Sequence, residues 1–374
     1  MIKILINLSN ISVGGGLQVS TSFIRDLPNF ENKYTIRLIV NTQQYSFCNN
    51  MTHIDVIQYE EKKGRDFSKR KYVGFLKEQE KSFKPDIVFT LFGPGFWRPK
   101  VKHVIGYAVP HYIYKDLPFK KAYGKASQIK ILLKEALDIF LFKKMSDYYV
   151  VETNDVKSRL AKRLKISSEK IFVVSNTYSN IFDSPELWKN DFTIRQNKKE
   201  FVLITITANY PHKNLSVIPA VIDVLIDNNR LTDFTFVLTI PKNNFKYNLS
   251  EKHLKHIKFI GKVGISQCPD LYRQSNVLFL PTLLECFSAS YLEAMKMAVP
   301  ILTSDYSFAT SICGDAAVYF DPLNMVDIAQ KIEAIALNPE LYQCMVEKSK
   351  NAIEKFPKSL ERTATYFDIL SKLI

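Results

Sequence analysis

Short runs of apolar, mostly β-branched or aromatic residues alternate with longer helical patterns along the whole chain. The runs are continuously apolar and do not alternate with polar residues, which is typical of strands buried on both faces of a sheet. Their repetition with intervening helices predicts parallel sheets joined by right-handed crossovers. The expected strands are 3–8, 35–40, 54–59, 86–92, 103–109, 148–153, 170–176, 201–208, 234–240, 257–261, 277–282, 300–305 and 316–320.

The chain has 374 residues, which is too long for a single hydrophobic core. A polar stretch without periodicity separates the seventh expected strand from the eighth. We therefore predict two doubly wound α/β domains at 1–178 and 199–350, a linker at 179–198, and a last helix within 351–374 that crosses back to the first domain. In open parallel sheets, ligands bind beyond the carboxyl ends of the strands. Residues that directly follow a strand are therefore the candidates for a site.

Positive charge is concentrated in the first half of the chain. The net charge is +14, and residues 1–190 hold 31 Lys/Arg against 18 Asp/Glu, while residues 191–374 hold 20 against 19. The basic segments are 61–75, 115–134 and 157–165. This asymmetry favours a polyanionic partner, which is nucleic acid, an anionic membrane surface or a phosphorylated substrate. The alternative is that these lysines are only solvated helix faces.

Several protein classes do not fit the sequence. No apolar run reaches the roughly 18–20 residues of a membrane span, and the apolar patch at the N-terminus is short for a signal peptide, so we expect a cytoplasmic protein. The cysteines and histidines are dispersed without metal-ligand spacing, which favours free thiols and no metal site. The cysteines are Cys48, Cys268, Cys286, Cys313 and Cys344.

Three features follow expected strands directly. Gly14, Gly15 and Gly16 lie between the first strand and a helix expected near Leu17, where glycines let a backbone approach an anion closely. They form neither a dinucleotide fingerprint nor a Walker loop, and a simple tight turn explains them equally well. His111 follows another strand and is either functional or structural. Lys213 follows the first strand of the second domain, where it either neutralises a phosphate or is a surface lysine.

Residues 283–295, LLECFSASYLEAM, carry two glutamates close to an apolar core. Carboxylates in such surroundings are costly unless a partner satisfies them. A helix beginning near Ser290 would make Ser290 and Glu293 a capping box, which is a complete structural explanation of Glu293. Nothing in the pattern gives Glu285 a structural partner. The alternative is a polar ligand, with an anion on the helix amides and the carboxylates on hydroxyl groups.

The stretch PTLLECFSASYLEAMKMAVPILTSD resembles the hallmark of the retaining GT-B glycosyltransferases, family 4 (glycosyl transferases group 1), of the bacterial polysaccharide type. The likeness consists of two glutamates separated by seven residues, then Ala-Met, then a strand led by proline. Weaker likenesses are the Gly-Gly-Gly loop, the Pro-His after a strand, VVSNTYSNIF and His-Lys-Asn. The resemblance implies a GT-B fold, in which two Rossmann-like domains face each other and a C-terminal helix packs back across the boundary.

The resemblance also implies a division of roles. Glu285 would lie beside the donor sugar, His111 would contact that sugar, and Lys213 would stabilise the leaving diphosphate. Glu293 would hold the ribose hydroxyls of the donor. The other implied donor-binding residues are Phe287, Ser288, Ala289, Ser290 and Asn209, and the loop Gly14–Gly16 would border the diphosphate and the acceptor. No metal or other cofactor is expected besides the nucleotide-sugar co-substrate.

Two positions depart from the pattern of this family. Its members commonly carry an arginine five or six residues before the lysine, where this chain has Ala208 and Thr207. The usual Gly-Phe-Gly of the hallmark is Cys286-Phe287-Ser288. Both departures concern the identity of the donor more than the fold.

The resemblance implies a metal-independent hexosyltransferase that moves a hexose from a UDP- or GDP-linked sugar to a hydroxyl of a lipid-linked glycan, with retention. The expected pathway is bacterial O-antigen or capsule synthesis. Basic clusters at 62–71 and 115–134, interleaved with Tyr72, Phe75, Phe119 and Tyr123, are expected to dock on the inner face of the cytoplasmic membrane.

Three alternatives remain open. A sugar-nucleotide epimerase of similar fold would convert the donor without an acceptor. An inactive sugar-binding homologue would show no turnover. A protein that binds nucleic acid or another polyanion through the basic half would leave the glutamate pair unexplained, and no nucleic-acid motif is present, so we expect no nucleic-acid partner.

Overall fold

The computed structural model describes residues 1–374 except 13, 50, 61–68 and 120–123. The chain forms two compact units. The first unit comprises Met1–Ile113, Ala126–Thr177 and Pro357–Ile374, and the second comprises Tyr114–Lys125 and Tyr178–Phe356. No helix in the described part of the chain is long and apolar enough to cross a membrane.

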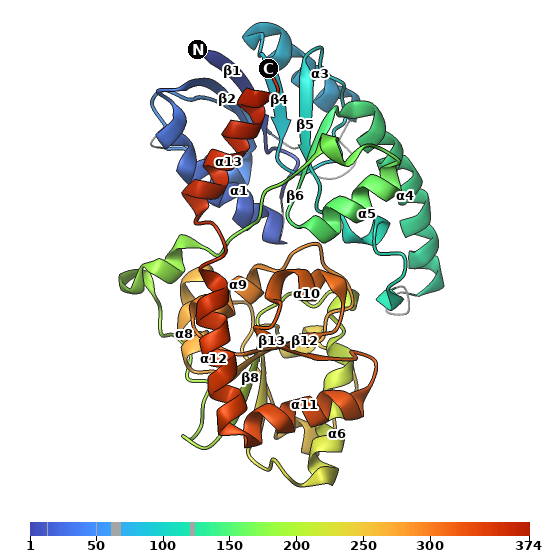
Figure 1. Cartoon of the computed structure of the whole chain (residues 1–374), viewed down its shortest axis with the longest axis vertical. Coiled ribbons are helices and arrows are strands. Elements are labelled where there is room, and N and C mark those ends of the chain that lie inside the picture. The colour runs from blue at the N-terminus through green and yellow to red at the C-terminus, as the bar shows by residue number, and fades with distance from the viewer. Residues whose placement is uncertain (13, 50, 61–68, 120–123) are drawn as a thin grey trace. The chain divides into compact units, whose positions relative to one another are not determined.

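A seven-stranded parallel sheet forms the centre of the first unit (Figure 1). The strand order is β3-β2-β1-β4-β5-β6-β7. Its strands are β1 (Ile2–Asn7), β2 (Tyr34–Asn41), β3 (Asp55–Tyr59), β4 (Ile87–Thr90), β5 (Lys102–Gly106), β6 (Tyr148–Val151) and β7 (Ile171–Val173). Its helices are α1 (Gly14–Asp26), α2 (Thr42–Tyr45), α3 (Lys69–Phe83), α4 (Lys125–Met145), α5 (Asn154–Leu164) and α13 (Ser359–Lys372).

Both faces of this sheet are covered. On β1, Ile4 and Ile6 point into a core with residues of α1 and α13, whereas Leu5 points into the opposite core with residues of α3. Successive strand residues face opposite sides, so a strand buried on both sides must be apolar at every position. This is the physical reason why the apolar runs in the sequence located the strands.

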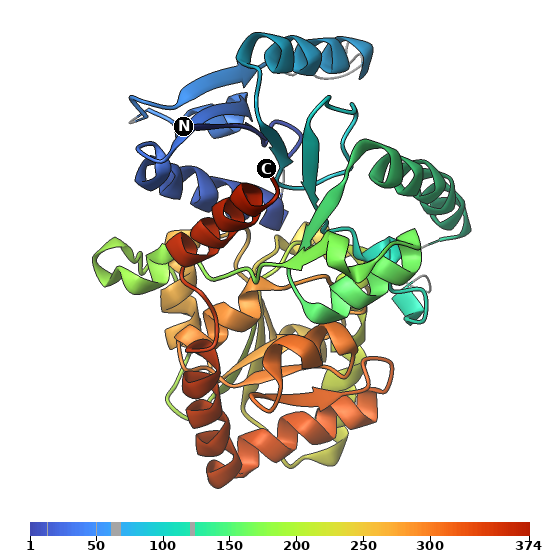
Figure 2. The same cartoon turned by 45° about the horizontal axis from the view of Figure 1, so that its top comes forward.

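The last helix, α13, packs against α1 (Figures 1 and 2). Phe367 stacks on Phe30 with ring centroids 4.4 Å apart, and Tyr366 packs against Phe89 at 5.2 Å. Asp26, at the end of α1, accepts hydrogen bonds from the hydroxyls of Ser359 and Thr363 at 2.6 and 2.7 Å. The C-terminal segment is therefore part of the core of the first unit.

One buried histidine on β5 makes the stability of the first unit depend on pH. His103 is fully buried between the Thr90 hydroxyl (2.9 Å) and the carbonyl of Met145 (2.6 Å). Burial lowers the pKa of His103 from 6.5 to about 4. Below pH 6.5 the unfolded chain therefore binds a proton that the folded chain does not, and stability falls as the pH drops towards about 4.

We expect this histidine to cost about 3 kcal/mol of stability over that range, because one pKa unit corresponds to about 1.4 kcal/mol. Urea unfolding of the wild type and of His103→Gln at several pH values measures the effect. The variant should be less stable at neutral pH but have a flatter acid slope. Parallel slopes for the two proteins would contradict the prediction.

A six-stranded parallel sheet forms the second unit, in the order β10-β9-β8-β11-β12-β13. Its strands are β8 (Phe201–Thr205), β9 (Phe234–Leu238), β10 (Ile257–Phe259), β11 (Val277–Leu280), β12 (Ile301–Ser304) and β13 (Ala317–Phe320). Its helices are α6 (Ile218–Asn228), α7 (Glu251–Leu254), α8 (Cys268–Arg273), α9 (Ala289–Lys296), α10 (Ser307–Cys313), α11 (Met325–Leu337) and α12 (Pro339–Ile353).

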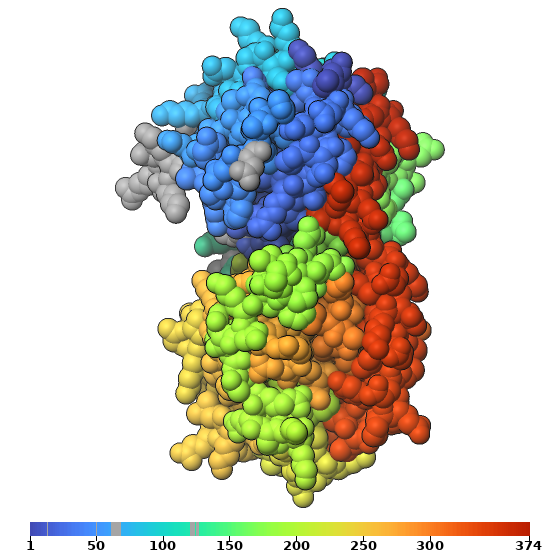
Figure 3. All heavy atoms as spheres, turned by 90° about the vertical axis from the view of Figure 1, so that its left-hand side faces the viewer, coloured from blue at the N-terminus to red at the C-terminus, as the bar shows by residue number. Residues whose placement is uncertain are grey.

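The α/β fold class with two parallel Rossmann-like sheets is confirmed, and all thirteen observed strands overlap expected ones. The segment expected as a linker lies against the second unit, where Figure 3 shows it covering neighbouring elements. The amide of Lys189 donates to the carbonyl of Ser266 at 2.9 Å, and Ile194 is fully buried.

Candidate functional site

The strands β8 and β11 are neighbours in the sheet of the second unit, and the strand order reverses between them. From β8 the chain continues to β9 and β10 on one side, whereas β11, β12 and β13 lie on the other side. The loops that leave the carboxyl ends of two such strands run to opposite sides of the sheet. The crevice between these two loops is where open α/β sheets bind ligands. Lys213 lies in the loop after β8, and Glu285 lies in the loop after β11.

Lys213 and Glu285 meet across this reversal point. The Lys213 ammonium donates a hydrogen bond to Glu285 Oε1 and forms an ion pair with it. Their side chains are only 16% and 12% exposed, so the pair is largely shielded from water. The expectation that Glu285 lacks a structural partner is therefore wrong, because 72 residues of chain separate it from the lysine that satisfies it.

One further contact joins the two loops, and another holds Glu285 in place. The amide of Leu283 donates to the carbonyl of His212 at 2.7 Å. The Thr282 hydroxyl lies 3.0 Å from Glu285 Oε1, to which it can donate. Thr282 thus fixes the carboxylate from the end of its own strand. This role was not predicted from the sequence, although the position of Thr282 at the end of an expected strand was a usable signal.

Glu293 lies on α9 and is 4% exposed. The hydroxyl of Tyr272 on α8 lies 3.2 Å from Glu293 Oε2 and 3.3 Å from the carbonyl of Ser290. Burial, and then the negative charge of Glu293, raise the pKa of Tyr272 far above its usual value. The phenol therefore stays protonated and remains a donor. The role of Tyr272 was not predicted from the sequence either.

The capping-box interpretation of Ser290 and Glu293 is wrong. The helix begins at Ala289, and Ser288 precedes it in an extended conformation without a capping bond from its side chain. Ser290 is thus already inside the helix, and it cannot serve as the cap. The structural explanation of Glu293 is instead its contact with the buried Tyr272.

The departures from the family pattern are accommodated locally. Ser288, at a position usually held by glycine, has φ −120°, which any L-residue adopts. At Thr207, one of the two positions where the family commonly has an arginine, the backbone amide donates to the Thr239 hydroxyl at 2.9 Å. The side chain of Asn209 donates to the carbonyl of Asn244. These bonds tie the loop after β8 to the loop after β9, in the place where the arginine was expected.

Phe287 lies in the second unit, two residues before α9, and the remaining predicted residues lie in the first unit. Gly14, Gly15 and Gly16 begin α1 after β1, and the helix therefore starts earlier than Leu17. Gly14 has φ +66°, which favours glycine. A side chain at Gly16 would lie 3.1 Å from Ile11 Cγ2. His111 lies in a short 3-10 helix (Pro110–Tyr112) after β5. The roles of His111 and of the glycine loop stay predictions.

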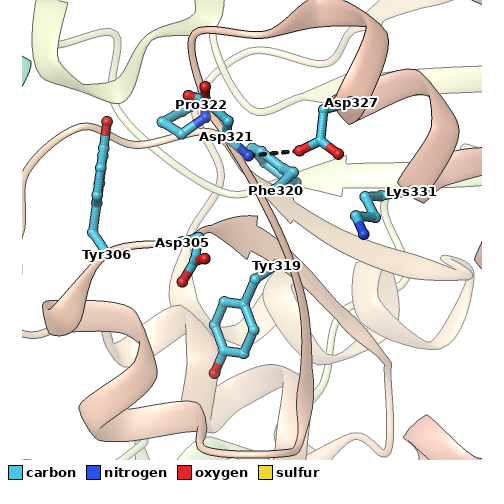
Figure 4. A pocket seen from close by; sticks show the side chains of 8 residues that line it. All are labelled: Asp305, Tyr306, Tyr319, Phe320, Asp321, Pro322, Asp327 and Lys331. Carbon is cyan, nitrogen blue, oxygen red and sulfur yellow. Dashed lines mark hydrogen bonds between the residues drawn. The ribbon is translucent and has the colours of Figure 1, made fainter.

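A cavity of about 480 Å³ opens at the carboxyl ends of β12 and β13 (Figure 4). Asn214, the residue after Lys213, donates from its side chain to the carbonyl of Pro322, which lines this cavity. Burial raises the pKa of Tyr306 to about 12, so its phenol is a donor at neutral pH. The lining residues are Asp305, Tyr306, Tyr319, Phe320, Asp321, Pro322, Asp327 and Lys331. None of these residues was predicted from the sequence to belong to a site.

The second unit is also the part of the chain in which a family match is found. Residues 187–352 match the family model described as glycosyl transferases group 1. The predicted resemblance is confirmed. The match contains both loops of the Lys213–Glu285 pair and the helix of Glu293.

Curated relatives and solved structures agree with this match. The chain is 24% identical over 218 residues to the O-antigen chain mannosyltransferase RfbU of Salmonella typhimurium, covering 56% of this chain and 54% of the relative. It is 25% identical over 189 residues to the UDP-Gal:alpha-D-GlcNAc-diphosphoundecaprenol alpha-1,3-galactosyltransferase of Escherichia coli, covering 48% of each. The chain thus spans about half the length of the curated relatives it matches.

The crystal structure of WaaG, a glycosyltransferase involved in lipopolysaccharide biosynthesis, has a similar fold. The TM-score is 0.71 with 12% identity, over 98% of this chain and 99% of that chain. At this identity the likeness concerns the fold alone, and it confirms the GT-B fold class.

Proposed function

We propose that this protein is a glycosyltransferase that moves a hexose from a UDP- or GDP-linked sugar to a hydroxyl of a lipid-linked glycan. The observation that carries the proposal is the shielded pair of Lys213 and Glu285 at the strand-order reversal of the second unit. A cation and a carboxylate at this place suit a ligand that has both a diphosphate and hydroxyl groups. The name of the first curated relative describes an O-antigen chain mannosyltransferase, and the name of the second gives a diphosphoundecaprenol-linked acceptor. Both names support the same class of reaction and a bacterial surface polysaccharide as product.

The proposed chemistry assigns a task to each group. The ammonium of Lys213 and the first amides of α9 stabilise the charge that develops on the departing nucleoside diphosphate. Glu285, held by Thr282, accepts hydrogen bonds from hydroxyls of the transferred sugar. Glu293, held by Tyr272, accepts hydrogen bonds from the ribose hydroxyls. When the diphosphate engages Lys213, the carboxylate of Glu285 is released from the ion pair and becomes available to the sugar.

The remaining parts of the proposal come from the family resemblance. The anomeric configuration is retained, and no metal takes part. The acceptor is bound by the first unit, at an anionic membrane surface. An NMR measurement of the anomeric configuration of the product, made with and without EDTA, tests retention and metal independence together.

Calorimetric titration with UDP, GDP, ADP and dTDP tests the donor site. We expect one of these nucleotides to bind. Glu293→Gln should weaken that binding by about tenfold to a hundredfold, because hydrogen bonds to a charged acceptor contribute about 1.5–3 kcal/mol. Glu340→Gln, the same change at an exposed glutamate on α12, serves as the control. No binding of any nucleotide at millimolar concentration would instead favour an inactive homologue or a polyanion-binding protein.

Product analysis separates the transferase from an epimerase. The transferase consumes the donor only when an acceptor is present, whereas the epimerase converts the donor alone.

A further inference from the structure

Helix α4 of the first unit carries its acidic groups inside. Glu135 and Asp138 are 3% and 6% exposed. Glu135 forms an ion pair with Arg163 of the neighbouring α5, and Asp138 accepts a hydrogen bond from the Tyr112 hydroxyl at 2.7 Å. Both views of the chain show α4 along the outside of its unit, beside α5 (Figures 1 and 2). These polar contacts fix which face of α4 points inwards.

The outward face of α4 is apolar. Residues three, four, seven and eleven positions apart share one face of a helix. Five large apolar side chains follow this spacing and are between 47% and 71% exposed, namely Ile129, Leu132, Leu133, Leu137 and Phe140. A continuous apolar stripe of this size is unusual on a soluble surface and marks an interaction site.

The exposed charges that the structure describes on α4 itself are all of one sign. Lys130, Lys134, Lys143 and Lys144 are exposed on α4, whereas both acidic residues of the helix are buried. A second copy of the chain packed on this stripe would bring like charges together, which disfavours a homodimer. An anionic lipid surface complements both features, because it offers acyl chains to the stripe and phosphates to the lysines.

We propose that α4 docks the protein on an anionic bilayer, lying in the plane of the interface with its apolar stripe at the acyl boundary. The inference rests on the proposed function, in that a lipid-linked acceptor is presented at such a surface. The expectation that Tyr72 and Phe119 dock on the membrane is wrong, because their exposed fractions are only 3% and 0%. Residues 62–68 and 120–123 of the expected basic clusters, which include Tyr123, lie outside the described residues.

Flotation with phosphatidylcholine vesicles, with and without phosphatidylglycerol, tests the proposal. The whole chain should bind the vesicles that contain phosphatidylglycerol. Leu133→Glu should lower the partition coefficient by about tenfold or more, because burial of one leucine in an apolar phase contributes at least that factor. Leu337→Glu, the same change at an exposed leucine of α11, should have no effect. The double variant Lys130→Gln/Lys134→Gln should reduce the salt dependence of binding while leaving an apolar component.

Three outcomes would overturn the proposal. The first is vesicle binding by Leu133→Glu that equals that of the wild type. The second is the absence of wild-type binding to either kind of vesicle. The third is a wild-type dimer in sedimentation experiments that Leu133→Glu dissociates, since a second copy would then cover the stripe. Nucleotide titration of the same samples separates the two proposals: nucleotide binding without vesicle binding removes this inference alone, and vesicle binding without nucleotide binding removes the proposed function.

Discussion

Replacing Lys213 by alanine should lower kcat by about a hundredfold to a thousandfold, the usual cost of losing one preorganised group that stabilises charge in a transition state. The ammonium of Lys213 is the proposed counter-charge of the leaving diphosphate. In the structure it is held in place by Glu285, from a side chain that is only 16% exposed. Steady-state kinetics with hexose derivatives of the nucleotide that binds in the titration measures the effect.

The same substitution leaves Glu285 without its cationic partner, so a structural loss must be separated from a catalytic one. The double variant Lys213→Ala/Glu285→Gln removes both charges and should recover thermal stability without recovering turnover. Lys350→Ala, which breaks an exposed ion pair with Glu347 on α12, should change neither. A double variant that turns over like the wild type would show that the pair is structural.

Replacing Asp26 by alanine should destabilise the first unit by about 3–5 kcal/mol, the usual cost of removing one partner of a buried charged pair. Asp26 is 5% exposed and Arg362 is 1% exposed. The Arg362 guanidinium lies 3.9 Å from the Asp26 carboxylate. The same carboxylate accepts hydrogen bonds from Ser359 and Thr363 of α13. Its loss removes a negative charge from beside a buried cation and takes an acceptor away from two buried hydroxyls.

Urea unfolding, together with hydrogen exchange of the amides in α13, measures this loss and locates it. Burial lowers the pKa of Arg362, which shows that its charge already lies in an unfavourable environment. The double variant Asp26→Ala/Arg362→Met should therefore be more stable than Asp26→Ala alone. A loss of stability below about 1 kcal/mol, within the range of exposed ion pairs, would contradict the prediction. It would mean that Glu152, the other carboxylate acting on Arg362, is sufficient to balance the charge of Arg362.

Sequence patterns located the strands well and the helix starts less well. Most strands are buried on both faces, so most of their positions are apolar and the signal is strong within a few residues. The start of α9 was placed at Ser290, and the structure places it at Ala289 with no capping side chain. A serine followed three residues later by a glutamate fits a capping box at the level of sequence, but only the backbone conformation decides which residue is the cap.

The candidate site was predictable in its residue types but not in its pairings. Lys213 and Glu285 were identified because each lies close after an expected strand, and Glu293 because it forms a pair with Glu285 in the stretch that resembles the family hallmark. Their partners were not identified, because Tyr272 lies on a different helix and the lysine on a different strand loop from Glu285.

Which face of α4 is buried was also not predictable from the sequence alone. Its sequence is apolar on most sides, which by itself is typical of a helix buried all round. The contacts of Glu135 and Asp138 decide which side is buried, and with it that the apolar stripe faces outwards.

The sequence by itself therefore determined the two parallel sheets, the places where loops leave them and the excess of positive charge in the first half. These follow from local burial, residue spacing and composition. Only the tertiary structure decided that Lys213 neutralises Glu285, that Tyr272 supports Glu293 and that α4 exposes its apolar face. Such contacts depend on the order of the strands and on how helices pack against their neighbours, which are set by residues far apart in the chain.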